Sequence, residues 1–334
     1  MTENTSPSLG ILLANTGTPD APTAWAVRRY LAQFLGDRRV IELPRWWWLP
    51  LLHGIILTFR PRRSARLYRR VWTAAGSPLL VNTDRLADGL RQRLAAGGQP
   101  ILVEVGMRYG NPSIASALRR LQEQGARRLV VLPLFPQYSA TTSGAILDAV
   151  FDELKTWRHI PPLRVVEPYY AHPAYIQALA HSLRSAWEAD GPPDRLLLSF
   201  HGIPLSYVQA GDPYPQHCGR TAELLAAALD LPPERWSLSY QSRFGPQQWL
   251  GPGTQETLLD LGRQAVRRLD AACPGFAVDC LETLDEIAHE GRQAFAGAGG
   301  GEFRYLPALN DRPAHVEALA QIVEENLAGW NPER

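Results

Sequence analysis

The stretch RLLLSFHGIP, residues 195–204, decides the fold that we predict for this chain. Its nearly continuous apolar run is typical of a parallel strand that is buried on both faces. His201 ends the run, and Gly202 and Pro204 then predict a turn. A titratable ring therefore stands at the carboxyl end of a buried strand.

Short apolar runs alternate with amphipathic stretches along the whole chain. Strands are predicted at 9–14, 101–105, 128–134, 163–166, 195–200, 235–240, 274–278 and 303–306. Helices are predicted near 21–35, 64–75, 83–95, 113–124, 143–156, 173–189, 217–229, 254–269, 281–296 and 313–328. This alternation favours the α/β class, with parallel sheets covered by helices on both faces.

The alternating pattern occurs twice, which predicts two doubly wound, Rossmann-like domains. We place them at 1–157 and 158–310, with prolines at 161, 162 and 168 marking the crossover. We expect the last helix, within 313–330, to pack back on the first domain. Ligands of such sheets bind beyond the carboxyl ends of the strands. His201 lies at one of these ends.

Composition narrows the class of protein. The chain has 334 residues, of which 45% are hydrophobic and 20% charged, and its formal net charge is +1. This balance does not indicate a nucleic-acid partner. Three cysteines without a CxxC pair fit a reducing compartment, and an all-cysteine iron–sulfur site usually needs four. The N-terminus lacks the features of a signal peptide, so we expect a cytoplasmic protein.

Two features indicate chemistry, and each also has an ordinary structural explanation. His201 either caps its strand or acts as a base or metal ligand, since imidazole titrates near neutral pH. Glu282, Glu286 and Glu290 follow at i, i+4 and i+8 of a predicted helix, which places three carboxylates in one row. Asp279 and Glu282 can instead form a capping box, and the row can be a solvated face. Together, the base and the row would suit a divalent cation that is held loosely.

The segment RWWWLPLLHGIILTFRPRR, residues 45–63, is apolar and flanked by arginines. It is too short and too interrupted for the roughly 18 apolar residues of a membrane span. It predicts either a core helix, a segment that lies on a membrane surface, or the lip of a site for a flat apolar substrate. Elsewhere, His217 and Cys218 lack a second ligand pair for zinc, and WLGPGT at 249–254 lacks a phosphate-loop pattern.

Several motifs, in this order along the chain, resemble the ferrochelatase family, whose enzymes insert Fe²⁺ into a porphyrin to make heme. The most specific are SFHGIP and GDPYPQ, followed by SYQSRFGPQQWLGP and DCLETLDEI. NTGTP, GSP at 76–78, MRYGNP at 107–112 and PLFPQYSATTSG at 133–144 extend the resemblance over nearly the whole chain. DCLETL and the tryptophan-rich segment look most like enzymes of Gram-negative bacteria that use protoporphyrin IX.

The resemblance implies a chelatase fold of two Rossmann-like halves with four-stranded sheets and the porphyrin between them. It implies that His201 and Glu282 are catalytic and contact the metal, with Glu286, Glu290 and Asp279 as a relay for protons or metal. The porphyrin-binding residues that it implies are Met107, Arg108, Tyr109, Tyr138 and Trp249, with Trp48 and Leu52 in the lip. Many animal enzymes have a histidine at the position of Cys280, so this position is not predicted to be essential.

The implied substrates are protoporphyrin IX and Fe²⁺, with heme as the product. The resemblance implies no tightly bound cofactor and no [2Fe–2S] cluster, and it suggests peripheral contact with the inner face of the membrane. Two alternatives stay open: a cobalt or nickel chelatase of related fold, and a heme or porphyrin carrier. A carrier would leave the carboxylate row without a use. The face from which iron enters also stays open.

Overall fold

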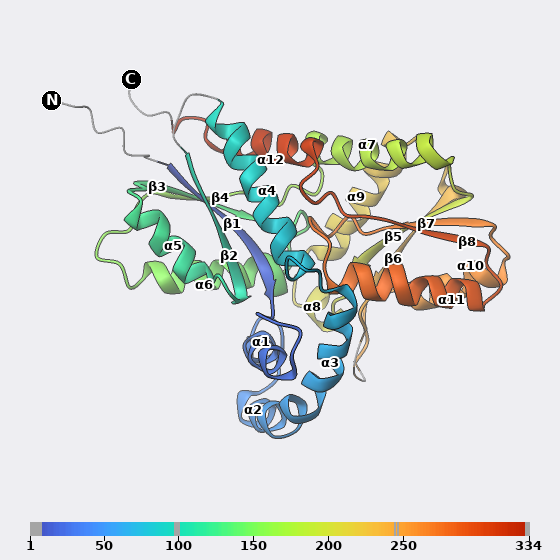
Figure 1. Ribbon diagram of the computed structural model, residues 1–334, viewed down its shortest axis with the longest axis horizontal. Coiled ribbons are helices and arrows are strands. Elements are labelled where there is room, and N and C mark those ends of the chain that lie inside the picture. The colour runs from blue at the N-terminus through green and yellow to red at the C-terminus, as the bar shows by residue number, and fades with distance from the viewer. Residues whose placement is uncertain (1–8, 97–100, 244, 246, 331–334) are drawn as a thin grey trace. The chain divides into compact units, whose positions relative to one another are not determined.

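The computed structural model describes residues 9–96, 101–243, 245 and 247–330. The chain forms two compact units (Figure 1), which are described here one at a time. The first comprises residues up to 135, 139–167 and those from 311 onward, and the second comprises 136–138 and 168–310. No helix of the described residues is long and apolar enough to cross a membrane.

The first unit contains a four-stranded parallel sheet in the order β2-β1-β3-β4. Its strands are β1 (Leu9–Thr18), β2 (Ile101–Gly110), β3 (Arg128–Pro133) and β4 (Leu163–Val165). Its helices are α1 (Ala24–Gly36), α2 (Arg45–Leu51), α3 (Leu57–Val71), α4 (Pro78–Ala95), α5 (Ile114–Glu123), α6 (Ala145–Leu154) and α12 (Pro313–Asn326). Two π-helical turns are η1 (Leu52–Ile56) and η2 (Ala140–Gly144).

Alternating residues of β1 enter two different layers of the first unit. Leu12 and Ala14 pack against α5 and α6 in one buried cluster. Ile11 and Leu13, which point to the opposite face, are also fully buried. On that side α4 crosses the sheet and packs on α12 (Figure 1). The near-continuous apolarity of the strand is thus explained by helices on both faces.

The second unit repeats this arrangement, with the strand order β6-β5-β7-β8. Its strands are β5 (Arg195–His201), β6 (Trp236–Gln241), β7 (Arg268–Ala272) and β8 (Glu302–Leu306). Its helices are α7 (Pro173–Asp190), α8 (Leu205–Gln209), α9 (Tyr214–Ala228), α10 (Thr254–Arg263) and α11 (Arg292–Gly297), with a 3₁₀ turn η3 (Pro233–Arg235) and a π-helix η4 (Glu282–Gly291). Leu196, Leu198 and Phe200 pack in one core cluster, and Leu197 packs in another.

The structure corrects two sequence predictions. The strand predicted at 163–166 corresponds to β4, which pairs with β3 and belongs to the first sheet, so the boundary placed after 157 lies after 167. The strand predicted at 274–278 is absent from this described segment, and β7 at Arg268–Ala272 occupies the position in the sheet. The sequence did not predict β7 because Asp270 and two alanines have a low preference for strands. The more apolar segment that follows does not form a strand, because Pro274 and Gly275 interrupt it.

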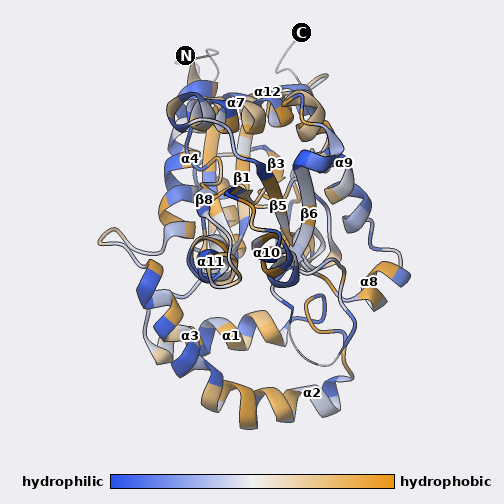
Figure 2. Cartoon of the chain, turned by 90° about the vertical axis from the view of Figure 1, so that its right-hand side faces the viewer, coloured by the Kyte–Doolittle hydropathy of each residue, from blue (hydrophilic) through white to orange (hydrophobic). Residues whose placement is uncertain are grey.

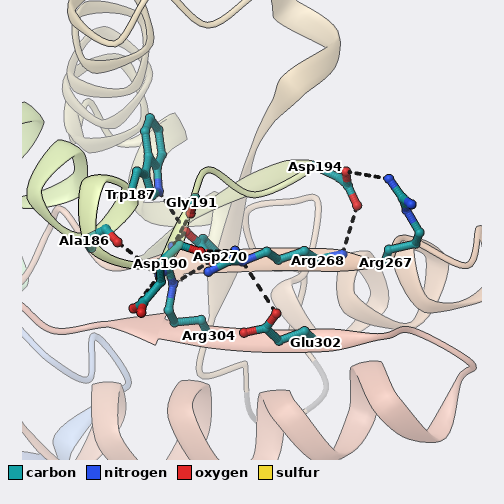
Figure 3. A network of polar contacts seen from close by, with 10 residues as sticks. All are labelled: Ala186, Trp187, Asp190, Gly191, Asp194, Arg267, Arg268, Asp270, Glu302 and Arg304. Carbon is teal, nitrogen blue, oxygen red and sulfur yellow. Dashed lines mark hydrogen bonds and ion pairs between the residues drawn. The ribbon is translucent and has the colours of Figure 1, made fainter.

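Asp270 is tolerated inside the sheet because its carboxylate is fully paired. Arg304 of β8 donates from Nε to Oδ1 at 3.0 Å and from Nη2 to Oδ2 at 2.6 Å, and the indole of Trp187 donates to Oδ2 at 2.8 Å (Figure 3). The side chain is wholly buried. A bidentate guanidinium and an indole thus compensate the loss of hydration.

Candidate functional site

His201 is the last residue of β5, as the sequence predicts, and its ring is half-buried. Its Nδ1 atom lies 2.7 Å from the backbone oxygen of Gly202. Because a carbonyl oxygen only accepts, Nδ1 carries the proton in this contact, and Nε2 keeps its lone pair when the ring is neutral. The local backbone therefore selects the tautomer that can accept a proton at Nε2.

Gly202 allows the chain to turn closely past the neighbouring strand. Its N–H donates to the oxygen of Gln241 at 2.8 Å, and a Cβ atom at this position would lie 2.8 Å from that oxygen and 3.3 Å from the ring of Trp249. Pro204 and Trp249 also form an isolated bridge. The structure thus brings the predicted residue Trp249 next to the turn that follows His201.

The predicted carboxylate row lies on η4, which is a π-helix rather than the expected α-helix. Glu282 and Glu286 are half-buried, whereas Glu290 is exposed. The row therefore runs from the interior of the unit to its surface. Short π-helical segments often occur at functional sites, because their i→i+5 hydrogen bonds change the direction of side chains.

Glu286 is held by the end of the neighbouring strand β6. The Ser242 amide donates to Oε1 at 2.6 Å, and the Ser242 hydroxyl donates to Oε2 at 2.5 Å. Burial raises the pKa of Glu286, while the hydrogen bonds from Ser242 and the charge of His201 act in the opposite direction. Glu282 raises it further. The Glu286 carboxylate thus interacts electrostatically with both His201 and Glu282 within the second unit.

Asp279 has the contacts of a structural residue. Its Oδ1 accepts from the hydroxyls of Thr283 at 2.9 Å and Tyr305 at 2.5 Å and from the amide of Ala308 at 3.3 Å. Its Oδ2 accepts from Nδ2 of Asn310 at 2.7 Å, and its own amide donates back to Oδ1 of Asn310 at 2.8 Å. The side chain is buried. These bonds favour a role in fixing the start of η4 over the predicted role in a relay.

Tyr138 belongs to the segment 136–138 of the second unit, and this segment is bonded to α9. Its backbone N–H donates to Nδ1 of His217 at 3.2 Å, and the His217 ring stacks on Tyr170 with centroids 3.8 Å apart. Burial lowers the pKa of His217, consistent with a neutral ring that accepts this bond. His217 therefore positions Tyr138, a use that the sequence analysis did not identify.

In the first unit, the predicted porphyrin residues near the end of β2 differ in exposure. Met107 and Tyr109 are buried, and the Tyr109 hydroxyl donates to Asp37 at 2.8 Å. Arg108 is partly exposed and pairs with the same carboxylate at 2.5 Å. It borders an open depression of about 580 Å³, whose lining residues are Gly36, Asp37, Arg38, Arg108, Asp148, Phe151, Asp152 and Lys155.

The predicted lip, residues 46–59, folds as α2, η1 and the start of α3. Trp48 and Leu52 are buried in the first unit, and Nε1 of Trp48 donates to the oxygen of Leu35 at 2.7 Å. These two side chains therefore attach the segment to α1, and their predicted contact with porphyrin stays a prediction. The exposed apolar side chains nearby are Trp46, Trp47, Leu49, Ile55 and Phe59.

The described residues contain no group of three or more His, Cys, Asp or Glu side chains arranged to hold a metal ion. Cys218, Cys273 and Cys280 are each buried and form no disulfide. Gln241 and Ser242, which hold η4, were missed by the sequence analysis. Their position at the end of a strand beside β5 could have identified them as candidate site residues, because neighbouring parallel strands end at the same edge of a sheet.

Comparison with known proteins identifies the family. The model of the family described as Ferrochelatase matches residues 8–327. A ferrochelatase of Thioalkalivibrio sulfidiphilus is 53% identical over 323 residues, covering 96% of this chain and 88% of its own length. A ferrochelatase of Nitrosomonas europaea is 50% identical over 329 residues, covering 98% and 90%.

Solved structures of other chelatases share the fold. SirB from Bacillus subtilis with Fe³⁺ has a TM-score of 0.56 at 14% identity and covers 97% of each chain. CbiX, described as the terminal enzyme of siroheme biosynthesis in denitrifying bacteria, has a TM-score of 0.51 at 16% identity, with 95% of this chain and 98% of its own covered. At such low identity these likenesses show the chelatase fold alone. The family model and the relatives that share about half of its residues show that this chain belongs to the ferrochelatase family.

Proposed function

We propose that His201, Glu282 and Glu286 carry out the chemistry of this ferrochelatase, in which Fe²⁺ enters protoporphyrin IX and two protons leave to give heme. The observation that carries the proposal is the pairing of an oriented imidazole with a carboxylate row. Nδ1 of His201 is fixed by its own backbone, and Glu286 interacts with this ring electrostatically. The second unit thus supplies both a proton acceptor and a route away from it.

The reaction needs an acceptor because a free-base porphyrin carries two pyrrole N–H groups, and both must lose their protons as the metal enters. In our proposal, Nε2 of His201 takes up the first proton, transfers it to the carboxylate row, and is then free to take up the second. Glu282 contacts the incoming Fe²⁺, which is a substrate with an affinity for carboxylate oxygen and imidazole nitrogen. Glu286 and the exposed Glu290 then pass protons to solvent. The increase in exposure from Glu286 to Glu290 supports this direction.

We further propose that Arg108, Tyr138 and Trp249 contact the porphyrin, together with Met107 and Tyr109. The contact between Trp249 and Gly202 supports the placement of an aromatic surface beside His201. An apolar lip suits a porphyrin with two propionates better than one with four, so we propose protoporphyrin rather than coproporphyrin. A much higher kcat/KM for coproporphyrin III would contradict this choice.

The proposal includes no tightly bound cofactor and no [2Fe–2S] cluster. What supports it is the composition, since the chain has three cysteines and an all-cysteine cluster usually needs four. Burial raises the pKa of all three thiols well above the usual range, which disfavours the thiolate that would bind a metal.

We propose that the protein is cytoplasmic and that α2, η1 and the start of α3 touch the inner surface of the membrane. The exposed apolar side chains include Trp46 at 81% and Phe59 at 72% relative exposure. Figure 2 shows hydrophobic residues along α2 and hydrophilic ones along α3. The α3 sequence, LTFRPRRSARLYRRV, contains six arginines and no acidic residue. An apolar face beside a basic one suits an anionic lipid surface.

Vesicle co-sedimentation tests this contact. Vesicles with anionic lipid should bind the wild type better than neutral vesicles, and the double variant Trp46→Ser/Phe59→Ser should lose most of this binding. The variant Phe151→Ser removes an exposed apolar side chain on α6, at 44% relative exposure and outside this segment, and serves as the control. Equal binding by all three proteins would contradict the proposal.

Metal insertion tests the proposed chemistry. Purified protein is mixed anaerobically with protoporphyrin IX and Fe²⁺, or with Zn²⁺ as a stable surrogate, and the porphyrin spectrum is followed. His201→Ala should lower turnover by about 100-fold or more, because positioned acid–base groups contribute on the order of 10²–10⁴-fold. Glu282→Gln should also lower it strongly.

The exposed His181 on α7 provides a matched control, and His181→Ala should retain wild-type turnover. Porphyrin binding, measured by fluorescence, should persist in all variants. Turnover of His201→Ala at the wild-type rate would contradict the role as base. A wild-type protein that binds heme tightly and never turns over would instead be a carrier.

A further inference from the structure

The end of β6 carries two residues, Gln241 and Ser242, that contact the carboxylate row. Gln241 is the register partner of His201 on the neighbouring parallel strand, and its backbone oxygen accepts the N–H of Gly202 at 2.8 Å. The side chain of Gln241 is almost completely buried. The backbone that bears His201 is therefore joined directly to the residues that hold η4.

The amide of Gln241 can take one orientation only. Its Oε1 accepts from the Ser199 hydroxyl at 2.9 Å, and its Nε2 donates to the backbone oxygen of Glu282 at 3.0 Å and to Oε2 of Glu286 at 3.4 Å. Reversing the amide would place Oε1 against two oxygen acceptors. The hydroxyls of Ser199 and Ser239 are both bonded to Thr254 at 2.8 Å. A buried chain of hydroxyls thus fixes an amide that points at η4.

Ser242 adds two donors to the same carboxylate. Its backbone has φ of 64°, in the left-handed region that residues other than glycine and asparagine rarely occupy. In this conformation its amide and its hydroxyl reach the two different oxygens of Glu286, at 2.6 and 2.5 Å. Together with Gln241, three donors converge on one half-buried carboxylate. A plain connection between strand and helix would not need a disfavoured conformation.

We propose that Gln241 and Ser242 are positioning residues that hold the Glu286 carboxylate beside His201. This inference rests on the proposed function, in which Glu286 receives the protons that leave the site. The two residues do not touch the reacting atoms. They fix the distance between the base on β5 and the first relay carboxylate on η4, because both are attached to the end of one strand.

Three substitutions at position 242 separate the hydroxyl from the backbone conformation. Ser242→Gly removes the hydroxyl and relaxes the left-handed backbone, whereas Ser242→Ala removes the hydroxyl and keeps the strain. Ser242→Asn favours the left-handed region and restores a side-chain donor. The wild-type enzyme and each full-length variant are assayed for Zn²⁺ insertion into protoporphyrin IX, with kcat and KM determined separately and thermal unfolding recorded.

The expected result is a roughly tenfold loss of kcat in the glycine and alanine variants, since a hydrogen bond to a charged group is lost in both. KM for the porphyrin should not change, and the asparagine variant should recover most of the activity. In an enzyme that already carries Glu286→Gln, Ser242→Ala should cause no further loss, because its effect passes through that carboxylate.

Other outcomes overturn the inference. Wild-type kcat for the glycine variant would show that the hydroxyl does not position Glu286. A further tenfold loss in the Glu286→Gln background would show that Ser242 acts elsewhere. If Glu286→Gln itself kept the wild-type kcat, the proposed relay would fail together with the inference. A slow Glu286→Gln enzyme with fully active position-242 variants would refute the positioning role alone.

Discussion

Asp279 provides a test between two roles for one residue. Its contacts predict a structural role, whereas the family resemblance predicts a role in the relay of protons or metal. In Asp279→Asn, the new NH₂ group must replace either Oδ1, which faces three donors, or Oδ2, which faces Nδ2 of Asn310. The second orientation costs less, since it loses one bond. The other three bonds then end on a neutral oxygen instead of a carboxylate.

The magnitude follows from these contacts. A hydrogen bond to a charged acceptor contributes about 1.5–3 kcal/mol, and a neutral one about 0.5–1.5 kcal/mol. Losing one bond and weakening three by about 1–1.5 kcal/mol each would cost about 4.5–7.5 kcal/mol, and the smaller desolvation cost of an amide offsets a large part of this. We therefore expect the free energy of unfolding to fall by about 3 kcal/mol. In a unit of this size the corresponding drop in Tm is roughly 6–12 °C.

Calorimetry and metal-insertion kinetics together provide the assay. Asp279→Asn should show the lower Tm, and its turnover per folded molecule at a low temperature should stay within about twofold of the wild type. Asp260→Asn is the control, because the pair of this carboxylate with Arg263 is exposed and such pairs contribute about 1 kcal/mol or less. An Asp279→Asn enzyme with the wild-type Tm and a turnover reduced tenfold would refute the structural argument and restore the relay.

Three further predictions concern the second unit. Asp270→Asn should lower the free energy of unfolding by about 3 kcal/mol in urea titrations, because it removes the buried carboxylate that pairs with the half-buried Arg304 guanidinium and leaves the exposed Asp190 as its counter-charge; an unchanged midpoint would contradict this. The folded state holds His217 neutral and lowers its pKa, so stability present above a pH of about 6.5 should be lost as the pH falls below it. His217→Asn keeps an acceptor for Tyr138 and should remove part of this dependence of Tm on pH. Gly202→Ala should reduce both Tm and kcat, since its Cβ would lie 2.8 Å from a backbone oxygen of the neighbouring strand, and wild-type values of both would show that the turn adapts.

The sequence predicted the elements whose hydrophobic pattern matches their burial. Strand β5 and its end at His201 were predicted correctly, because each face of the strand packs against its own core cluster. Strand β7 was missed, because Asp270 is compatible with a buried strand only when Arg304 is opposite. That pairing depends on the register of β7 with β8, which a single sequence does not reveal.

The residues of the candidate site, like the strands, could be predicted in part from the sequence. The residues that we propose for the chemistry, such as His201 and Glu282, could be selected from their types and from the motifs around them. Gln241 and Ser242 could not, since a glutamine and a serine at a strand end are common, and their use depends on the position of η4. The sequence also did not reveal that Trp48 and Leu52, within a segment that has exposed apolar residues, are themselves buried.

The two units share a strand order but differ in the side chains at the ends of their equivalent strands. Strands β1 and β5 hold equivalent places, each second in an order of four. Yet β1 ends in uncharged side chains that are bonded within their own unit, with Asn15 to Thr83 at 3.2 Å and Thr18 to Ser77 at 2.8 Å, whereas β5 ends in His201. The same strand order thus carries uncharged, internally bonded side chains at one central strand and, at the equivalent strand of the second unit, an imidazole at the edge where the carboxylate row begins.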